Sequence, residues 1–225
     1  MMEPPRLRIL CLHGYRQDAE SFRTKCRPIQ KATKNFADFM FLTAPTPIGG
    51  KDRERGWWIS RPNFLKDIHE PETQDENFEQ ALRLVSDIVE SEGPFDGILA
   101  FSQGACFASY ILRLGGRIFG DYDGVNFKFA VLFSGYESRF TRHLRDTQIT
   151  IPTLHYYGLT DKVIPPEKCI DFGKMFSNIE VHEHDGGHFL PTTGDPKKII
   201  VEYIKKFVPV VESSPNSSVS NESCG

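Results

Sequence analysis

The serine at position 102 stands in the pentapeptide Ala-Phe-Ser-Gln-Gly, residues 100–104. An apolar stretch at 96–101 precedes it, and a segment of helical character at 103–114 follows it directly. On such an abrupt strand-to-helix turn the residues two before and two after the serine must be small, and Ala100 and Gly104 are. The start of a helix also favours the negative charge that develops in acyl transfer. We therefore predict that Ser102 is a nucleophile; Ser134 also ends a strand, but no helix follows it, and we interpret it as a loop residue.

A serine needs a base and an orienting acid, which in this strand–turn–helix arrangement follow it in the chain order acid, then histidine. Asp161 comes just after an apolar stretch at 152–157, and His188 follows the next stretch, 178–184, behind two glycines. The order and the strand ends predict that Ser102, Asp161 and His188 form a triad. Two alternatives stay open: Asp161 could serve only a turn, and His182 or His184 could compete with His188.

The same chemistry needs backbone N–H groups that stabilise an oxyanion. His13, Gly14 and Tyr15 follow the first apolar stretch, and Gln103 follows the serine. We predict that the main-chain N–H groups of Tyr15 and Gln103 form this oxyanion hole, and we interpret His13 as a structural or wall-forming residue.

A long segment without clear periodicity covers residues 44–71 and contains the adjacent Trp57 and Trp58. Loops of this length are usually functional or disordered, and two indoles argue against plain disorder. One interpretation is that the pair lines an apolar groove for an acyl chain, and the other is that it packs in the core. Whether residues 44–71 act as a lid is open. The 18 phenylalanines of the chain allow the same two interpretations.

Apolar stretches that alternate with helical segments would position these residues. Six strand-like stretches alternate with helices along the chain, and the central ones are continuously apolar, as in a parallel sheet covered on both faces. We predict an α/β fold with about six mostly parallel strands in one domain, residues 1–208. The helix expected at 18–34 should be interrupted near Pro28. Residues 209–225 are rich in Ser and Asn and predict a disordered tail.

Charge and cysteine content exclude several classes of protein. With 27 basic and 30 acidic residues the net charge is −3, so no nucleic-acid partner is expected. Five cysteines without paired spacing suit neither a disulfide framework nor a zinc site. The chain shows no signal peptide and no membrane span, so a cytoplasmic or nuclear location is expected. The oligomeric state is open.

Five blocks in the chain together resemble the serine hydrolase FSH family of α/β-hydrolases: LCLHGYRQ from Leu10, RGWW from Arg55, GPFDGILAFSQGA from Gly93, YGLTDKVIP from Tyr157 and DGGHFLP from Asp185. They span most of residues 7–207. The resemblance implies a compact α/β-hydrolase without a large cap domain, a triad at Ser102, Asp161 and His188, and hydrolysis of carboxylic esters with alkyl chains in an apolar cleft. Ala100 departs from the glycine common at that position in the family.

The sequence thus predicts a serine esterase that acts, without metal or cofactor, on small esters with medium or long alkyl chains. Two alternatives remain. The same acyl-enzyme chemistry would serve an acyl thioesterase, and a protein that kept the fold could bind ligands without catalysis.

Overall fold

One parallel six-stranded sheet forms the centre of the protein. The computed structural model describes residues 5–60, 75–115, 127–142, 144 and 146–209. The strands run in the order β2-β1-β5-β6-β7-β8, and all five pairings are parallel. Their bounds are β1 Leu7–Leu12, β2 Ala37–Leu42, β5 Gly97–Phe101, β6 Phe129–Phe133, β7 Thr153–Gly158 and β8 Ile179–His184. These are the six strands that the apolar stretches predict.

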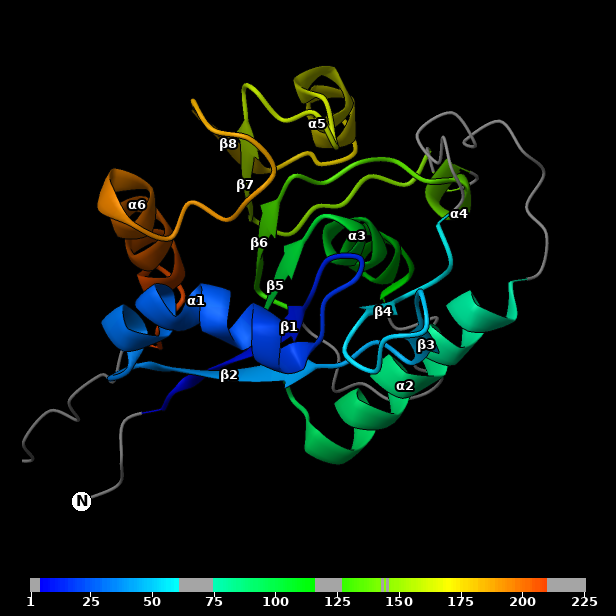
Figure 1. Cartoon of the computed structure of the whole chain (residues 1–225). Helices are drawn as coiled ribbons and strands as arrows, with labels where there is room; N and C mark the ends of the chain where they lie inside the picture. The colour runs from blue at the N-terminus through cyan, green and yellow to red at the C-terminus, as the bar shows by residue number, and fades with distance from the viewer. Residues whose placement is uncertain (1–4, 61–74, 116–126, 143, 145, 210–225) are drawn as a thin grey trace, which may run out of the picture.

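Helices cover both faces of this sheet (Figure 1). One face packs against α1 (Ala19–Thr33) and α6 (Gly194–Lys205). The other packs against α2 (Glu76–Glu92), α3 (Gln103–Leu114) and α5 (Pro166–Gly173). A short helix, α4 (Arg139–Arg142), follows β6. The fold is therefore the α/β arrangement that the sequence predicts.

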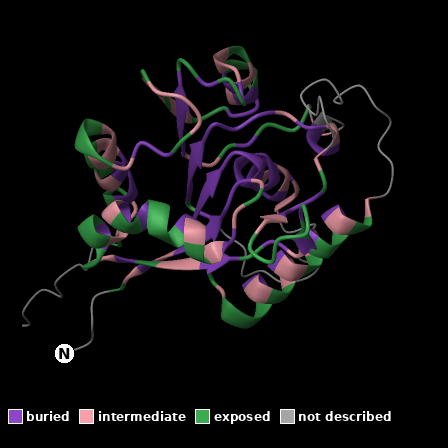
Figure 2. Ribbon diagram, viewed as in Figure 1, coloured by how far each residue is buried: buried purple, intermediate pink, exposed green. Residues whose placement is uncertain are grey.

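Burial explains why the central strands are apolar at every position. All residues of β5 and β6 are buried (Figure 2). Along β5, Ile98 and Ala100 point into the core under α2 and α3, whereas Leu99 and Phe101 point into the core under α1 and α6. Alternate residues of a strand face opposite sides, so two cores require an apolar residue at each position. Twelve phenylalanines are buried in these cores, which favours the core interpretation of the high Phe content.

The predicted interruption of the first helix near Pro28 is wrong. Helix α1 continues through Pro28 to Thr33 and begins with a capping box, in which Asp18 and Ser21 bind each other's backbone N–H. Phe22 and Cys26 before the proline and Ile29 after it are all buried on the sheet. This burial outweighs the hydrogen bond that the proline cannot make.

The segment after β2 is more regular than expected. Two short strands, β3 (Thr46–Pro47) and β4 (Arg55–Gly56), pair antiparallel within it. Residues 61–71, the rest of the predicted long loop, lie outside the described residues, and so does the predicted tail from residue 210 on. Nothing in the described ranges forms a cap domain, and none of their helices is long and apolar enough to cross a bilayer.

Candidate active site

Ser102 sits on a strained turn between β5 and α3. Its φ is 53° and its ψ is −116°, a backbone conformation that residues other than glycine rarely adopt. Its N–H donates to the carbonyl of Phe133 at the end of β6. A Cβ atom on Gly104 would lie 2.3 Å from the carbonyl oxygen of Leu12, so only glycine lets α3 start this close to β1. The steric requirement predicted at position 104 is thus visible in the structure.

His188 and Asp161 complete a chain of two hydrogen bonds that ends on Ser102. His188 Nε2 lies 2.9 Å from Ser102 Oγ, and His188 Nδ1 lies 2.6 Å from Asp161 Oδ2. Because a carboxylate only accepts, Nδ1 carries the proton and Nε2 is free to accept the serine proton. The imidazole also packs on Phe101, with ring centroids 4.7 Å apart, which fixes its plane.

The carboxylate of Asp161 is held from its other side by backbone N–H groups. Asp161 Oδ1 accepts from Val163 N at 2.8 Å and from Ile164 N at 2.9 Å, and the side chain is fully buried. The turn that the sequence offered as an alternative for Asp161 therefore exists, but it uses only one carboxylate oxygen. The second oxygen faces His188, so the turn orients the acid.

The two residues predicted for the oxyanion hole adjoin the serine or a residue that packs on it. Gly14 lies against the turn between β5 and α3, since a Cβ atom on it would be 2.8 Å from the Phe101 ring and 3.4 Å from Ser102 Cβ. Tyr15 follows it directly, and Gln103 is the first residue of α3. Within the described residues neither the Tyr15 nor the Gln103 N–H meets an acceptor. An oxyanion hole formed by these two N–H groups stays a prediction.

Trp57 and Trp58 lie in the core, with side chains 0% and 4% exposed. The Trp57 ring stacks on Phe107 of α3, 5.0 Å between centroids, and Trp58 packs against Phe78 and Phe140. A contact with substrate stays a prediction for both, and their observed neighbours are core aromatics.

The competing residues do not join this arrangement. Ser134 follows β6 with a φ of 46°, is fully buried, and finds no hydrogen-bond partner for its hydroxyl among the described residues. His182 pairs with Glu180 at 2.8 Å, and the ring of His184 packs on Phe189. Neither histidine forms a hydrogen bond with Ser102 or Asp161, because both belong to β8 and not to the loop beyond its end.

Apolar side chains next to the acid and the base are exposed, which the sequence pattern did not reveal. Leu159 and Val163, on either side of Asp161, are 45% and 50% exposed, and Phe189, next to His188, is 50% exposed. We call these three residues the apolar rim. A strand pattern marks buried residues, but it cannot mark which loop residues stay uncovered.

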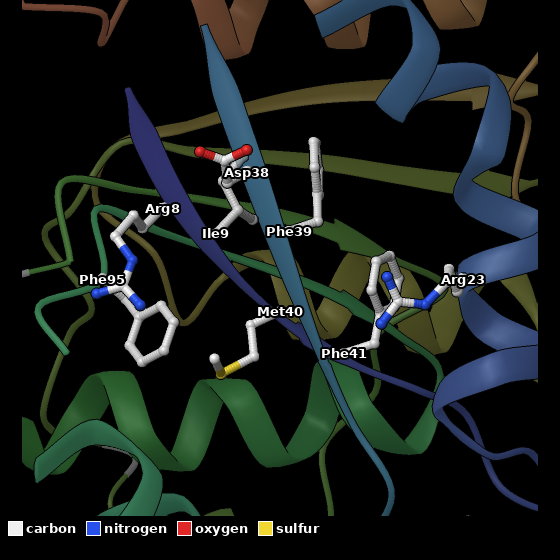
Figure 3. A pocket seen from close by; sticks show the side chains of 8 residues that line it. All are labelled: Arg8, Ile9, Arg23, Asp38, Phe39, Met40, Phe41 and Phe95. Carbon is white, nitrogen blue, oxygen red and sulfur yellow. The ribbon is translucent and has the colours of Figure 1, made fainter. Parts of the chain in front are cut away.

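A hollow of about 260 Å³ lies elsewhere, along β1 and β2. Its lining includes Arg8 beside Phe95 and Arg23 beside Phe41 (Figure 3). No residue of the triad lines it. In the described ranges no three His, Cys, Asp or Glu side chains gather as metal ligands would.

Comparison with known proteins assigns the family. The model of the serine hydrolase (FSH1) family matches residues 2–200. The chain belongs to this family. It is thus an enzyme of the serine hydrolase class, as the five sequence blocks predict.

Relatives of this FSH1 family member include named esterases and solved α/β-hydrolases. Esterase GA18864 of Drosophila pseudoobscura pseudoobscura is 34% identical over 96% of this chain and 78% of its own length. Esterase OVCA2 of Homo sapiens is 30% identical over 89% of this chain and 96% of its own. Among solved structures, acyl-protein thioesterase 2 of Zea mays superposes with a TM-score of 0.69 at 19% identity, covering 92% of this chain and 95% of that one. That structural likeness shows the shared fold.

Proposed function

We propose that this protein is a serine esterase that hydrolyses carboxylic esters with medium or long alkyl chains. The observation that carries the proposal is the chain of hydrogen bonds from Asp161 through His188 to Ser102, at 2.6 Å and 2.9 Å. The family and the esterases among its relatives support ester hydrolysis. The four cysteines that the structure describes are buried free thiols, which supports a reducing location such as the cytoplasm.

The reaction proceeds in two halves. Ser102 Oγ attacks the ester carbonyl carbon while its proton passes to His188 Nε2, and Asp161 stabilises the resulting imidazolium. The N–H groups of Tyr15 and Gln103 bind the oxyanion. The C–O bond then breaks, the alcohol takes the proton from His188, and the acyl group stays on Ser102. Water attacks the acyl-enzyme with His188 as base, which releases the acid and restores the serine.

Labelling with a fluorophosphonate probe tests the nucleophile. The folded protein should react, and Ser102→Ala should not. Ser134→Ala is the control, because its hydroxyl is buried outside the hydrogen-bonded chain. A folded wild-type protein that fails to react would leave ligand binding without catalysis as the remaining explanation.

The apolar rim supports the preference for longer chains, because its residues adjoin the acid and the base in sequence, and exposed apolar area gains free energy when an alkyl chain covers it, about 0.8 kcal/mol per methylene. We expect kcat/KM for p-nitrophenyl esters to rise with acyl length, and the rise to weaken in Phe189→Ser. Val181→Ser is the matched control, since Val181 is 46% exposed but lies midway along β8. Equal rates for short and long chains would refute the preference.

A matched thioester, if hydrolysed faster than its ester, would reassign the enzyme as a thioesterase.

A further inference from the structure

His13 is fully buried directly after β1, and the proposed reaction does not use its side chain. Its Nδ1 lies 2.7 Å from the Gly14 carbonyl oxygen, and its Nε2 lies 2.9 Å from the Ala44 amide nitrogen. A carbonyl only accepts and an amide N–H only donates, so Nδ1 carries the proton and Nε2 accepts. The contacts therefore fix one neutral tautomer, and burial lowers the pKa of His13 to about 4.

The Gly14 carbonyl that His13 binds belongs to the same peptide group as the Tyr15 N–H. A peptide group is planar and trans, so its C=O and N–H point in opposite directions. A hydrogen bond that holds the carbonyl of Gly14 therefore also sets the direction of the Tyr15 N–H. The Gly14 carbonyl also accepts from Gln17 N at 3.2 Å, and the His13 bond adds a second, shorter restraint to a glycine, whose backbone is freer than that of any other residue. A side chain could not replace glycine here, since its Cβ would collide with Phe101.

Trp57 connects His13 to Gln103, the residue that follows Ser102. Its indole Nε1 donates to the His13 carbonyl at 2.8 Å, and its ring lies 5.2 Å from the His13 ring. The backbone N–H of Trp57 donates to the side-chain oxygen of Gln103 at 2.9 Å, and Gln103 Nε2 donates to the Trp58 carbonyl. A buried network thus ties His13 to Gln103 through Trp57.

We propose that His13 is a positioning residue which, braced by Trp57, aims the Tyr15 N–H at the oxyanion. The inference rests on the proposed function and deepens it. It gives Trp57 and the Gln103 side chain a role in holding the oxyanion hole in shape before substrate arrives. A preformed hole avoids reorganisation at the moment of reaction.

Two substitutions separate the two hydrogen bonds of His13. In His13→Asn the amide nitrogen takes the place of Nδ1 and can still donate to the Gly14 carbonyl, but it does not reach Ala44. In His13→Gln the amide oxygen takes the place of Nε2 and can accept from Ala44 N, but the bond to Gly14 is lost. Each variant keeps one of the two hydrogen bonds, so the pair is matched in polarity and burial.

The experiment measures kcat and KM for one p-nitrophenyl ester, the affinity for a trifluoromethyl ketone that forms an oxyanion on Ser102, and the melting temperature. We expect kcat of His13→Gln to fall about 10- to 100-fold with KM unchanged, and ketone affinity to fall by the same factor. His13→Asn should retain most of both. Trp57→Phe, which keeps an aromatic ring but loses the N–H, should shift kcat and ketone affinity in the same direction as His13→Gln.

Three outcomes would overturn the inference. In the first, folded His13→Gln retains the kcat of the wild type. In the second, the two His13 variants lose kcat equally. In the third, kcat follows the melting temperature across all three variants, while the ratio of ketone affinity to substrate affinity stays constant. In each of these cases Ser102-dependent hydrolysis by the wild type would leave the proposed function intact. If the wild type itself neither hydrolyses the ester nor reacts with a fluorophosphonate, the proposed function fails and this inference fails with it.

Discussion

Acid should destabilise this protein well above the pH at which carboxylates titrate, because two of its histidines are buried in their neutral form. His155, on the central strand β7, is fully buried; its Nε2 accepts from Gly135 N at 3.1 Å, and its Nδ1 has no partner in the described part of the chain. Burial lowers the pKa of His155 to about 3, and that of His13 to about 4. Both histidines have a pKa of about 6.5 in the unfolded chain.

The sign and size of the effect follow from these pKa values. Below pH 6.5 the unfolded chain takes up a proton at each histidine and the folded protein does not, until the pH nears 4 for His13 and 3 for His155. The stability that the two neutral histidines contribute is therefore fully present above pH 6.5. It is lost as the pH falls from 6.5 toward 4 for His13 and toward 3 for His155. Between pH 7 and pH 5 each histidine lowers the free energy of unfolding by about 2 kcal/mol. Together they remove about 4 kcal/mol from a free energy of unfolding that is typically 5–15 kcal/mol.

Urea unfolding at pH 7, 6 and 5 measures this loss as the free energy of unfolding. His155→Gln is the informative variant, because its amide oxygen can accept from Gly135 N and does not titrate. Its stability should fall by about 2 kcal/mol less than that of the wild type over the same range. Asp18, whose pKa the Arg53 hydrogen bond lowers to about 2, does not titrate in this window. A free energy of unfolding that is the same at pH 7 and pH 5, or an equal slope in the variant, would refute the reasoning.

Three further substitutions test the site and the packing that supports it. Asp161→Asn should lower kcat about 10⁴-fold, measured on a short ester, because the amide disturbs the imidazole tautomer while the fold stays intact. Gly104→Ala should abolish soluble, active protein, measured as yield and melting temperature, since its Cβ meets the Leu12 carbonyl at 2.3 Å. Asp75→Ala should cost about 3–5 kcal/mol in urea unfolding, because Asp75 caps α2 and forms a nearly buried ion pair of 2.7 Å with Arg139.

Matched controls make these outcomes specific. Gly173→Ala should be tolerated, because the nearest atom to its new Cβ is 3.7 Å away. Asp75→Asn keeps an oxygen for the cap and should cost less than Asp75→Ala. Equal costs for the two Asp75 variants, a tolerated Gly104→Ala, or less than a tenfold loss of kcat in Asp161→Asn would each contradict the stated cause.

The sheet and the order of the triad could be predicted because both depend on local patterns. Strands such as β5 and β6 are apolar at every position, and parallel strands bring their carboxyl ends to one edge. Ser102, Asp161 and His188 each follow a strand of this parallel sheet, so their meeting follows from the topology. The course of α1 through Pro28 could not be predicted in the same way, because it depends on burial against residues distant in the sequence.

The network around His13 also lay beyond sequence reasoning. Its hydrogen bonds join His13 to Ala44 and Trp57, and Trp57 to Gln103, across 31 to 46 positions of the chain. No periodic pattern encodes such contacts, since each depends on where two loops meet over the sheet. The blocks around His13 and Trp57 were visible as motifs, but their shared position beside the serine became apparent only in three dimensions.

Strand β2 has a consequence outside the chemistry. It ends the sheet and pairs only with β1 among the described strands, so its other edge carries unpaired backbone groups. An apolar strand edge of this kind is a template on which a second molecule can add a strand and start aggregation. Here Asp38 pairs with Arg6 at 2.7 Å, and Arg23 lies over the ring of Phe41. Charged side chains on an edge strand disfavour edge-to-edge pairing, so Asp38 and Arg23 have a role at this edge that is separate from hydrolysis.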